Sequence, residues 1–318
     1  MFSRLPAILN LQVLEGAPLN RYTRFGIGGD AQLLADATSE DALIGALRWI
    51  AENKLPHAVI GGGTNLIADD SGFPGIVLRY AASGVEIDGS TVHVKAGTVL
   101  QDLVDQTVAH GLQGLETMTG IPGWMGGAIY GNAGAYGHSI SEIVQTVRFF
   151  DGGRVREIGN QDCEFRYRES VFKSHKDWII LSATLRLHPA ESSDLRATAE
   201  GILNIRNQKY PTTMRCAGSI FKNLLLSELP ESLAKQIPER VIREGKVPSA
   251  YFLELAGAKG MSNGAIRVAD YHANLIYNEG SGTALALRQI IGELKSRVCD
   301  RFGILLEEEV QYVSSPRS

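Results

Sequence analysis

Three segments of the chain carry apolar residues at every third or fourth position, which is the spacing of an amphipathic helix. In the first, Ser39 precedes two acidic residues and an apolar stripe, which predicts a helix that begins directly after it. The other two helices are predicted at about Val99–His110 and Thr283–Arg301. Each is followed by a glycine, Gly111 or Gly303, which is the expected stop.

Short runs rich in β-branched and aromatic residues lie between these helices and predict strands. The sequence "VRFFDGGRVREI" predicts a hairpin, because the two glycines after Asp151 supply the positive φ that a tight turn needs. The segment "ILLEEEVQYV" predicts a closing strand, in which alternation places Leu305, Glu307 and Glu309 on one face. Further strands are expected within residues 31–37, 57–63, 75–81, 91–97, 144–150 and 178–187.

The texture of the sequence changes after residue 187, where a polar stretch with a proline begins. We expect an N-terminal segment at residues 1–17, an α+β domain of many short strands at residues 18–188, and a second, smaller domain at residues 189–318. Residues 224–248 have the character of an insertion, in which prolines interrupt otherwise helical patterns.

Composition places the chain among ordinary globular proteins. Of 318 residues, 44% are hydrophobic and 21% are charged, and the net charge of -4 argues against nucleic-acid binding. No stretch reaches the ~18 apolar residues of a membrane span, and the N-terminus lacks the features of a secretory leader. We therefore expect a cytoplasmic protein without a nucleic-acid or membrane partner. The three cysteines are widely spaced, which predicts buried thiols and neither a disulfide nor a metal site.

Glycine is the outlier of the composition, at 35 residues, and it gathers in three stretches. "GIGGDA" (26–31) matches a dinucleotide-binding pattern, but a strand-like run follows it where that motif requires a helix. "VIGGGTNLIADD" (59–70) places three glycines after a strand, where successive N–H groups can form a nest for a diphosphate; a plain turn is the alternative. "GIPGWMGGAIYGNAGAYG" (120–137) interleaves glycines with apolar anchors, which favours an ordered loop against a flat or anionic ligand over a flexible linker.

The order and spacing of several motifs resemble those of the UDP-N-acetylenolpyruvoylglucosamine reductase family, over nearly the whole chain. The motifs are "NRYTRFGIGGDA", "VIGGGTNLIADDSGFPGIVLR", "GLETMTGIPGWMGGAIYGNAGAYG", "FRYRESVFK", "AGSIFKN", "AGAKG", "HANLIYNEG" and "FGILLEEEV". The resemblance implies an α+β fold, with an FAD-binding domain of the vanillyl-alcohol-oxidase (PCMH) type followed by a smaller α+β C-terminal substrate domain. The chain resembles the shorter type, which lacks an extra tyrosine-bearing loop.

The resemblance also implies an activity. NADPH would reduce bound FAD, and flavin N5 would pass hydride to the enolpyruvyl group of UDP-N-acetylglucosamine enolpyruvate, giving UDP-N-acetylmuramate for peptidoglycan synthesis. FAD would lie along the glycine-rich stretches at residues 59–70 and 120–137. The residues implied to contact it are Gly61, Gly62, Gly63, Thr64, Asn65, Leu66, Gly120, Ile121, Pro122, Gly126, Gly127, Ala128, Asn132, Gly134 and Ala135. Trp124 and Met125 stand where the family usually has small or β-branched residues, and their effect stays open.

Three residues match the catalytic positions of the family. Arg168 in "YRES" is implied to stabilise an enediolate-like intermediate, because a guanidinium can bind a carboxylate through two hydrogen bonds. Ser219 in "AGSIFKN" is implied to donate a proton to that intermediate, and Glu309 in "GILLEEEV" to face it as a neutral acid or beside a cation. The alternatives are a structural ion pair for Arg168, a turn serine at 219 and a solvated glutamate at 309.

Tyr167, Lys209 and Asn223 match positions that the family uses for its nucleotide-sugar substrate. Ala269 and Tyr271 differ from the family's usual residues before "HANL", so contacts to NADPH or substrate can differ there. A monomer without a metal is expected. Two rival functions stay open, namely a flavin oxidase or dehydrogenase of the same fold and a catalytically silent binding protein; the complete catalytic set argues against the second.

Overall fold

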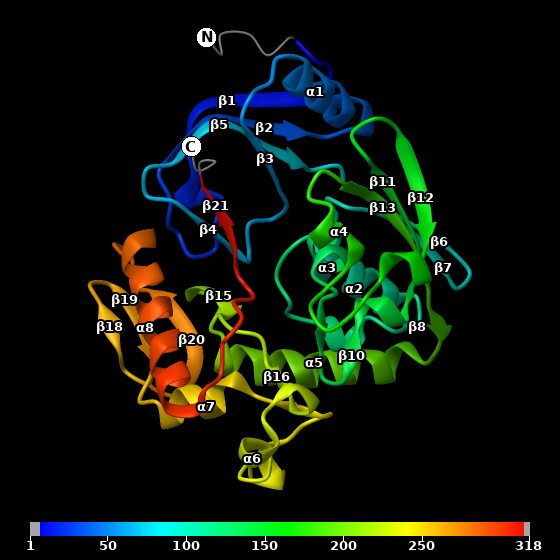
Figure 1. Ribbon diagram of the computed structural model, residues 1–318. Coiled ribbons are helices and arrows are strands. Elements are labelled where there is room, and N and C mark those ends of the chain that lie inside the picture. The colour runs from blue at the N-terminus through cyan, green and yellow to red at the C-terminus, as the bar shows by residue number, and fades with distance from the viewer. Residues whose placement is uncertain (1–6, 315–318) are drawn as a thin grey trace. The chain divides into compact units, whose positions relative to one another are not determined.

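The computed structural model describes residues 7–314, which form two compact units (Figure 1). The first unit contains the described residues up to Ala17, then Ala31–Gly63 and Pro74–Thr212. The second contains Pro18–Asp30, Thr64–Phe73 and the described residues from Thr213 on. The first unit therefore extends beyond the domain boundary expected after residue 188. The assignment of functional domains to sequence ranges stays a prediction, and residues 1–6 of the expected N-terminal segment lie outside the described residues.

The first unit contains two larger sheets. One has the strand order β1-β2-β5-β3, with β3 and β5 parallel; the other is antiparallel, with the order β12-β11-β13-β7-β6. The elements of this unit are β1 (Leu11–Pro18), β2 (Asp30–Ala37), α1 (Glu40–Glu52), β3 (His57–Ile60), β5 (Phe73–Tyr80), β6 (Val85–Asp88), β7 (Thr91–Lys95), α2 (Leu100–Ala109), β8 (Leu112–Gln113), α3 (Met125–Tyr130), β9 (Gly134–Ala135), β10 (His138–Ser139), β11 (Val144–Phe150), β12 (Val155–Gly159), α4 (Val171–Ser174), β13 (Ile179–Arg186), β14 (His188–Pro189) and α5 (Ser192–Lys209).

The second unit is built on an antiparallel sheet of order β15-β20-β19-β18 and a small parallel pair, β21-β4. Its elements are β4 (Leu66–Ala68), β15 (Arg215–Ser219), β16 (Leu224–Leu225), α6 (Glu231–Ala234), β17 (Lys246–Val247), α7 (Ser249–Leu255), β18 (Ser262–Asn263), β19 (Ile266–Ala269), β20 (His272–Asn278), α8 (Ala284–Phe302) and β21 (Gln311–Val313). The long helix α8 buries an apolar stripe that includes Leu287, Ile291 and Leu294 in the core of this unit.

The three predicted helices are confirmed as α1, α2 and α8. The hydroxyl of Ser39 accepts a hydrogen bond from the amide of Ala42 at 3.2 Å, so it caps α1 as its position predicted. Helix α8 ends at Gly303, whose φ of 67° is the left-handed conformation that favours glycine. The predicted hairpin is confirmed as β11–β12, with Asp151 Oδ1 accepting from the amide of Arg154 at 2.8 Å.

The N-terminus of helix α8 is capped by a residue that is far away in the sequence. The two carboxylate oxygens of Asp70 accept hydrogen bonds from the amides of Ala284 and Leu285 at 2.7 and 2.9 Å. These amides belong to the first turn, where no helical carbonyl is available to them. Asp70 therefore fastens the "IADD" segment to the start of α8, and its negative charge lies at the positive end of the helix dipole.

The prediction of a closing strand over residues 304–313 is only partly correct. Strand β21 is limited to Gln311–Val313 and pairs in parallel with β4. The preceding residues form one isolated bridge, between Glu308 and Phe221, and no regular ladder. Burial still alternates at the start of this segment, since Leu306 is 2% exposed and Leu305 is 82% exposed. The alternating pattern therefore predicted correctly which of these leucines is buried, but the strand is shorter than predicted.

The "GIGGDA" stretch is a close-packed turn. Strand β2 follows it at Asp30, so it lacks the helix of a dinucleotide fingerprint, as the sequence indicated. A Cβ atom on Gly28 would lie 2.6 Å from the Cβ of Ala68, and one on Gly29 would lie 2.3 Å from the carbonyl oxygen of Asp70. These glycines allow two backbone segments of the second unit to lie against each other.

Residues 224–248 form an excursion within the second unit whose two ends are paired. Leu224 pairs with Val247, and Leu225 with Lys246, so β16 and β17 close the base of the excursion. Pro230 and Pro238 stand directly before short helical turns and do not lie inside them. Ile237 is 7% exposed and belongs to the core of this unit, so the excursion is packed against the second unit.

Among residues 7–314, no helix is both long and apolar enough to cross a membrane. In the same part of the chain, no group of three or more His, Cys, Asp or Glu side chains is placed to hold a metal ion. All three cysteines are free thiols; Cys163 and Cys216 are buried, as the sequence predicted, and Cys299 is half-buried.

Candidate functional site

Two glycine-rich stretches form the candidate site, residues 59–70, here called the first, and residues 120–137, here called the second. The loop of the first stretch follows strand β3. A Cβ atom on Gly61 would meet no other atom within 4 Å, so the backbone there is accessible to a ligand. The neighbouring Gly62 is different, because a Cβ atom on it would lie 3.2 Å from Cδ1 of the Trp124 ring. Gly63 has a φ of 69°, which favours glycine. The loop therefore combines an open glycine, one packed against an indole and one needed for the turn.

The second glycine-rich stretch is ordered, which agrees with the prediction from its apolar anchors. The amide of Gly126 donates to the carbonyl oxygen of Ala96 at 2.8 Å, and the amide of Met125 donates to that of Thr98 at 2.9 Å. A Cβ atom on Gly126 would lie 2.9 Å from the Cβ of Ala96, whereas one on Gly127 would meet nothing within 4 Å. In helix α3, Gly126 therefore packs closely against Ala96, whereas no protein atom covers the position that a Cβ of Gly127 would take.

Trp124 and Met125 have different environments. Met125 is fully buried and belongs to the core of the first unit. Trp124 is half-buried, and the guanidinium carbon of Arg79 lies 5.3 Å from the centre of its ring. The indole therefore lies beside the Gly62 loop, while the methionine side chain points into the core.

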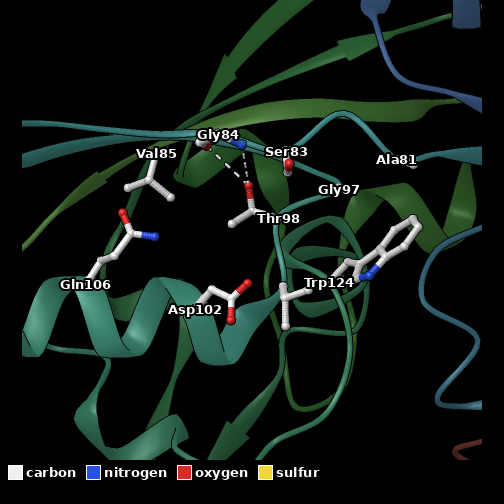
Figure 2. Close-up of a pocket in the computed structure, with 10 residues that line it drawn as sticks. Ala81, Ser83, Gly84, Val85, Gly97, Thr98, Asp102, Gln106 and Trp124 are labelled. Carbon is white, nitrogen blue, oxygen red and sulfur yellow. Dashed lines mark hydrogen bonds between the residues drawn. The ribbon is translucent and has the colours of Figure 1, made fainter. Parts of the chain in front are cut away.

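A cavity of about 310 Å³ has Trp124 among its lining residues (Figure 2). Asp102 and Gln106 of α2 border it on one side, and the segment that contains Ser83 and Gly84 borders it on the other. Thr98 closes the gap between two of its segments, since its hydroxyl bonds to the amide and carbonyl of Gly84 at 3.0 and 3.2 Å. The remaining lining residues are Ala81, Val85, Gly97 and Val99.

Two buried hydroxyl oxygens near the start of the second stretch have no hydrogen-bond partner in the protein, Thr117 Oγ1 and Thr119 Oγ1. Thr119 is 2% exposed and directly precedes Gly120, whose amide donates to Oε1 of Gln101 at 2.7 Å. An unpartnered buried hydroxyl costs about 1–3 kcal/mol. A bound polar group would satisfy these hydroxyls, so this observation and the bare glycines 61 and 127 fit a cofactor with hydrogen-bonding groups.

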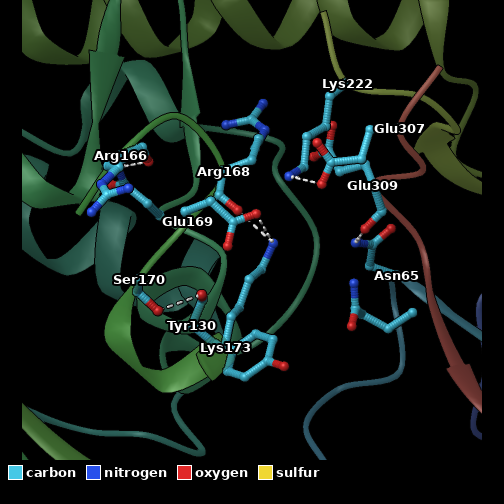
Figure 3. A network of polar contacts seen from close by, with 12 residues as sticks. Asn65, Tyr130, Arg166, Arg168, Glu169, Ser170, Lys173, Lys222, Glu307 and Glu309 are labelled. Carbon is cyan, nitrogen blue, oxygen red and sulfur yellow. Dashed lines mark hydrogen bonds and ion pairs between the residues drawn. The ribbon is translucent and has the colours of Figure 1, made fainter. Parts of the chain in front are cut away.

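The second glycine-rich stretch is joined to the "FRYRES" segment by side-chain hydrogen bonds. Asn132 Nδ2 donates to the carbonyl oxygen of Arg166 at 2.8 Å. The hydroxyl of Ser170 donates to the backbone carbonyl oxygen of Tyr130 at 2.7 Å (Figure 3). Asn132 is 6% exposed, and its Oδ1 accepts from the amide of Ser141. The predicted cofactor residue Asn132 therefore uses its side chain to hold the protein together.

Arg168 lies in the sequence between Arg166 and Ser170, the two residues of the segment that form these bonds. Its Nη2 donates to the carbonyl oxygen of Gly134 at 3.0 Å, and its guanidinium carbon is 5.3 Å from the centre of the Tyr167 ring. The backbone of Arg168 is left-handed, with a φ of 59°, and its carbonyl oxygen accepts from Nζ of Lys173 at 2.5 Å. A left-handed non-glycine residue is strained, and such strain gathers at functional sites. Lys173 also pairs with Glu169, at 3.4 Å.

Tyr130 is a titratable group at this junction. Burial raises the pKa of its phenol, and the nearby carboxylate of Glu169 raises the pKa further. The phenol is therefore neutral at neutral pH and can act as a hydrogen-bond donor.

In the second unit, Ser219 ends strand β15, where it pairs with Leu275 of β20 after an irregularity in the register. The residues that follow Ser219 run against the closing segment of the chain. The amide of Glu309 donates to the carbonyl oxygen of Ile220 at 2.7 Å, and the amide of Lys222 donates to that of Glu307 at 2.9 Å. Two of the three predicted catalytic residues thus lie on adjacent segments of one unit, although they are 90 positions apart in the sequence.

Asn65 contacts the same segment. Its Nδ2 donates to the carbonyl oxygen of Glu309 at 2.8 Å (Figure 3). Its own backbone carbonyl oxygen accepts from the amide of Gln311 at 2.9 Å. Leu66 follows in strand β4 and pairs with Gln311. The "TNL" end of the first glycine-rich loop is therefore tied to the backbone at Glu309.

Sequence reasoning missed two groups that hold this part of the second unit. Asn274 of the "HANL" motif is 2% exposed; its Oδ1 accepts from the amide of Phe221, and its Nδ2 donates to the carbonyl oxygen of Phe221, both at 2.9 Å. Lys222 is 8% exposed and forms an ion pair with Glu307. The signal for Asn274 was an amide between apolar residues of a strand, which needs a partner when buried.

The predicted substrate residues are divided between the units. Lys209 ends α5 in the first unit, with Nζ 5.0 Å from the centre of the Tyr210 ring. Asn223 is in the second unit, and its Oδ1 accepts from the amide of Ser249 at 3.4 Å. The first unit also holds glycines 61–63, residues 120–135, Tyr167 and Arg168; the second holds residues 64–66, Ser219 and Glu309.

Comparison with known proteins gives two family matches along the chain. Residues 31–159 match an FAD binding domain, and residues 210–313 match the C-terminal domain of UDP-N-acetylenolpyruvoylglucosamine reductase. These matches agree with the expected fold class, an FAD-binding domain followed by the C-terminal domain of that reductase.

Full-length relatives carry the same name. The chain is 57% identical to a UDP-N-acetylenolpyruvoylglucosamine reductase of Solibacter usitatus, over 98% of this chain and 99% of the relative. It is 36% identical to one of Rubrobacter xylanophilus, over 94% of each. Among solved structures, the UDP-N-acetylenolpyruvylglucosamine reductase of Thermus caldophilus matches with a TM-score of 0.73 and 25% identity, over 95% of this chain and 98% of that one.

Proposed function

The chain belongs to the UDP-N-acetylenolpyruvoylglucosamine reductase family, and we propose that Arg168, Ser219 and Glu309 carry the chemistry of its reaction. The enzyme is an FAD-dependent UDP-N-acetylmuramate dehydrogenase of peptidoglycan precursor synthesis, and NADPH is its reductant. The single structural observation that supports the assignment is the hydrogen-bonded contact between the Ser219 and Glu309 segments in the second unit.

The residues of both glycine-rich stretches fit FAD. Gly61 and Gly127 leave bare backbone, and the buried hydroxyl of Thr119 needs a polar partner. Bound FAD supplies the hydride that reduces the enolpyruvyl double bond. We assign the cofactor to glycines 61–63, Thr64 to Leu66, Gly120 to Pro122, Gly126 to Ala128, Asn132, Gly134 and Ala135. Asn65 and Asn132 contribute through their backbones, because their side chains are engaged in the protein.

Arg168 binds the carboxylate of the enolpyruvyl group. Addition of hydride to the terminal carbon leaves negative charge on the neighbouring carbon and on this carboxylate, so a fixed cation stabilises the intermediate more than the substrate. The guanidinium is held at Gly134 and over the ring of Tyr167, which limits its freedom before substrate binds.

Ser219 donates a proton to the carbon that carries this charge. A serine hydroxyl is a weak acid, but the carbanion-like carbon is strongly basic, so the transfer is favourable. Glu309 faces the same intermediate as a neutral acid or beside a cation, because a bare carboxylate would repel it. Tyr167, Lys209 and Asn223 bind the nucleotide sugar. We also infer a monomeric cytoplasmic enzyme without a membrane partner, and its net charge of -4 argues against nucleic-acid binding.

The test measures the two half-reactions separately, namely reduction of the flavin by NADPH and reoxidation of the flavin by the enolpyruvyl substrate. Purified protein should carry flavin absorbance, and NADPH oxidation should require UDP-N-acetylglucosamine enolpyruvate. In Ser219→Ala, reduction of the flavin by NADPH should stay near the unmodified rate, while its reoxidation by substrate should slow by roughly 10²–10⁴-fold. Equal loss in both halves would show that Ser219 has a structural role.

The rival oxidase or dehydrogenase of the same fold makes a different prediction. It expects NADPH-independent flavin reduction by some other substrate, or turnover that does not depend on the enolpyruvyl compound. Flavin reoxidation by oxygen at the same rate with and without that compound would favour the rival.

A further inference from the structure

We propose that Asn65 is a positioning residue for Glu309, so that the loop of the first glycine-rich stretch and the placement of this acid are mechanically linked. The proposal rests on the function assigned above to Glu309. It changes the role of Asn65, which the sequence suggested as a direct contact of the cofactor diphosphate.

The peptide groups on both sides of Glu309 are held by different segments of the second unit. The amide of Glu309 donates to Ile220, next to Ser219, at 2.7 Å, and its carbonyl oxygen accepts from Asn65 Nδ2 at 2.8 Å. Glu309 lies on a stretch without a regular ladder, between an isolated bridge at Glu308 and strand β21. The two bonds at Glu309 therefore fix the backbone from which its side chain projects, together with the neighbouring bonds from Lys222 to Glu307 and from Gln311 to Asn65.

Asn65 is itself well fixed. Its carbonyl oxygen accepts from the amide of Gln311 at 2.9 Å, and Leu66 then enters strand β4, which pairs with β21. Asn65 therefore forms one hydrogen bond on each side of residue 310, through its side chain and its backbone. Loss of the Asn65 side-chain bond would therefore release the carbonyl of Glu309 and leave only the backbone bond to Gln311 on this side. A reacting group displaced by about 1 Å can lose about 100-fold in rate.

The experiment compares Asn65→Ala and Asn65→Asp. Alanine removes the donor, and aspartate keeps the shape but places an acceptor against the carbonyl of Glu309. Asn53→Ala is the matched control, because Asn53 Nδ2 also donates to a backbone carbonyl at 2.8 Å, that of Trp49, at the exposed end of α1. Each protein is purified with its flavin, and both half-reactions are followed by stopped-flow absorbance across the pH range.

We expect both Asn65 variants to retain flavin and to be reduced by NADPH at within about threefold of the unmodified rate. Reoxidation by UDP-N-acetylglucosamine enolpyruvate should slow by about 10- to 100-fold. Asn53→Ala should match the unmodified enzyme in both halves.

A double-mutant cycle with Glu309→Gln distinguishes positioning from a structural or cofactor-binding role. If Asn65 acts through Glu309, Asn65→Ala should slow reoxidation much less in the Glu309→Gln background than in the unmodified one. Equal effects in both backgrounds, or loss of flavin from both Asn65 variants with normal reoxidation per bound flavin, would overturn the proposal. If the enolpyruvyl compound does not reoxidise the flavin of the unmodified enzyme, the proposed function itself is wrong. That result needs no variant, so it is distinguished from failure of the proposal for Asn65.

Discussion

The guanidinium of Arg168 donates a hydrogen bond to the carbonyl oxygen of Gly134, so the proposed catalytic cation is anchored on the glycine-rich stretch that is assigned to the flavin. The left-handed backbone of Arg168 and the ammonium of Lys173 on its carbonyl hold the other end of the residue. The position of the cation is therefore decided by the same loop that would bind the cofactor.

Gly134→Ala should impair catalysis through this loop. A Cβ atom there would lie 2.5 Å from the carbonyl oxygen of His138, so β9 and β10 must move apart and carry the Arg168 anchor with them. We expect kcat for reduction of the enolpyruvyl substrate to fall by roughly 10- to 100-fold. Steady-state kinetics with flavin content measured in parallel would check this. Gly201→Ala is the control, because it adds a methyl group in open space on α5 and should leave kcat unchanged; an equal loss in both variants would refute the argument.

Asn274→Leu should destabilise the second unit strongly. The substitution leaves the amide and the carbonyl of Phe221 without the Asn274 side chain that now pairs with both, in a fully buried position. We expect the free energy of unfolding to fall by about 2–4 kcal/mol. Urea denaturation monitored by circular dichroism measures this value, and a change below about 0.5 kcal/mol, typical of surface substitutions, would show that the clamp is unimportant.

Asp70→Ala should weaken the start of α8. The variant loses two hydrogen bonds to first-turn amides and the favourable interaction of a negative charge with the helix dipole. The expected loss is about 1–2 kcal/mol in the free energy of unfolding. Asp70→Asn retains one acceptor oxygen and should lose less than the alanine variant. Thermal and urea unfolding of the three proteins would give this order, and equal stability of all three would contradict it.

Ionisation of the Cys163 thiol should lower the free energy of unfolding at alkaline pH. Burial, with a smaller effect of Asp162, raises the pKa of the Cys163 thiol from 9.0 to about 12. Between these values the unfolded chain loses the proton while the folded chain keeps it, so the free energy of unfolding falls as pH rises. The slope from this group is at most about 1.4 kcal/mol per pH unit.

The measurement is a series of urea denaturation curves from pH 8 to about pH 11. Cys163→Ala should show a shallower decline than the unmodified protein in the window above pH 9, whatever its stability at pH 8. Tyr80, whose pKa burial raises to about 12, contributes equally to both proteins and does not obscure the difference. Parallel declines would mean that the thiol ionises equally in the folded and unfolded states.

Hydrophobic spacing predicted the elements whose burial is strongly one-sided. Helices α1 and α8 and strands such as β13 could be read from the sequence, because their apolar residues repeat with a clear period. Helix α5 was missed although it has 18 residues, since only Leu195 and Ile202 are buried along it. A helix with so few buried positions leaves little periodic signal in the sequence.

The candidate site shows a similar limit. The motifs identified which residues belong together, but a motif does not say whether a side chain faces a ligand or the protein. Asn132 and Asn65 both stand in the proposed cofactor stretches, yet their side chains hold Arg166 and Glu309. The paired hydrogen bonds of Asn274 with Phe221 connect residues 53 positions apart, and a single sequence contains no information on such long-range partners.

The contact between Trp124 and Gly62 gives this protein an intrinsic optical reporter. Indole emission depends on the immediate surroundings of the ring, and flavins absorb in the region where tryptophan emits. Of the three tryptophans, Trp49 lies on helix α1 and Trp178 is stacked on Phe149 and His175, whereas Trp124 lies beside the glycine loop. Movement or filling of that loop therefore changes the fluorescence of a native residue, and no attached dye is needed to observe it.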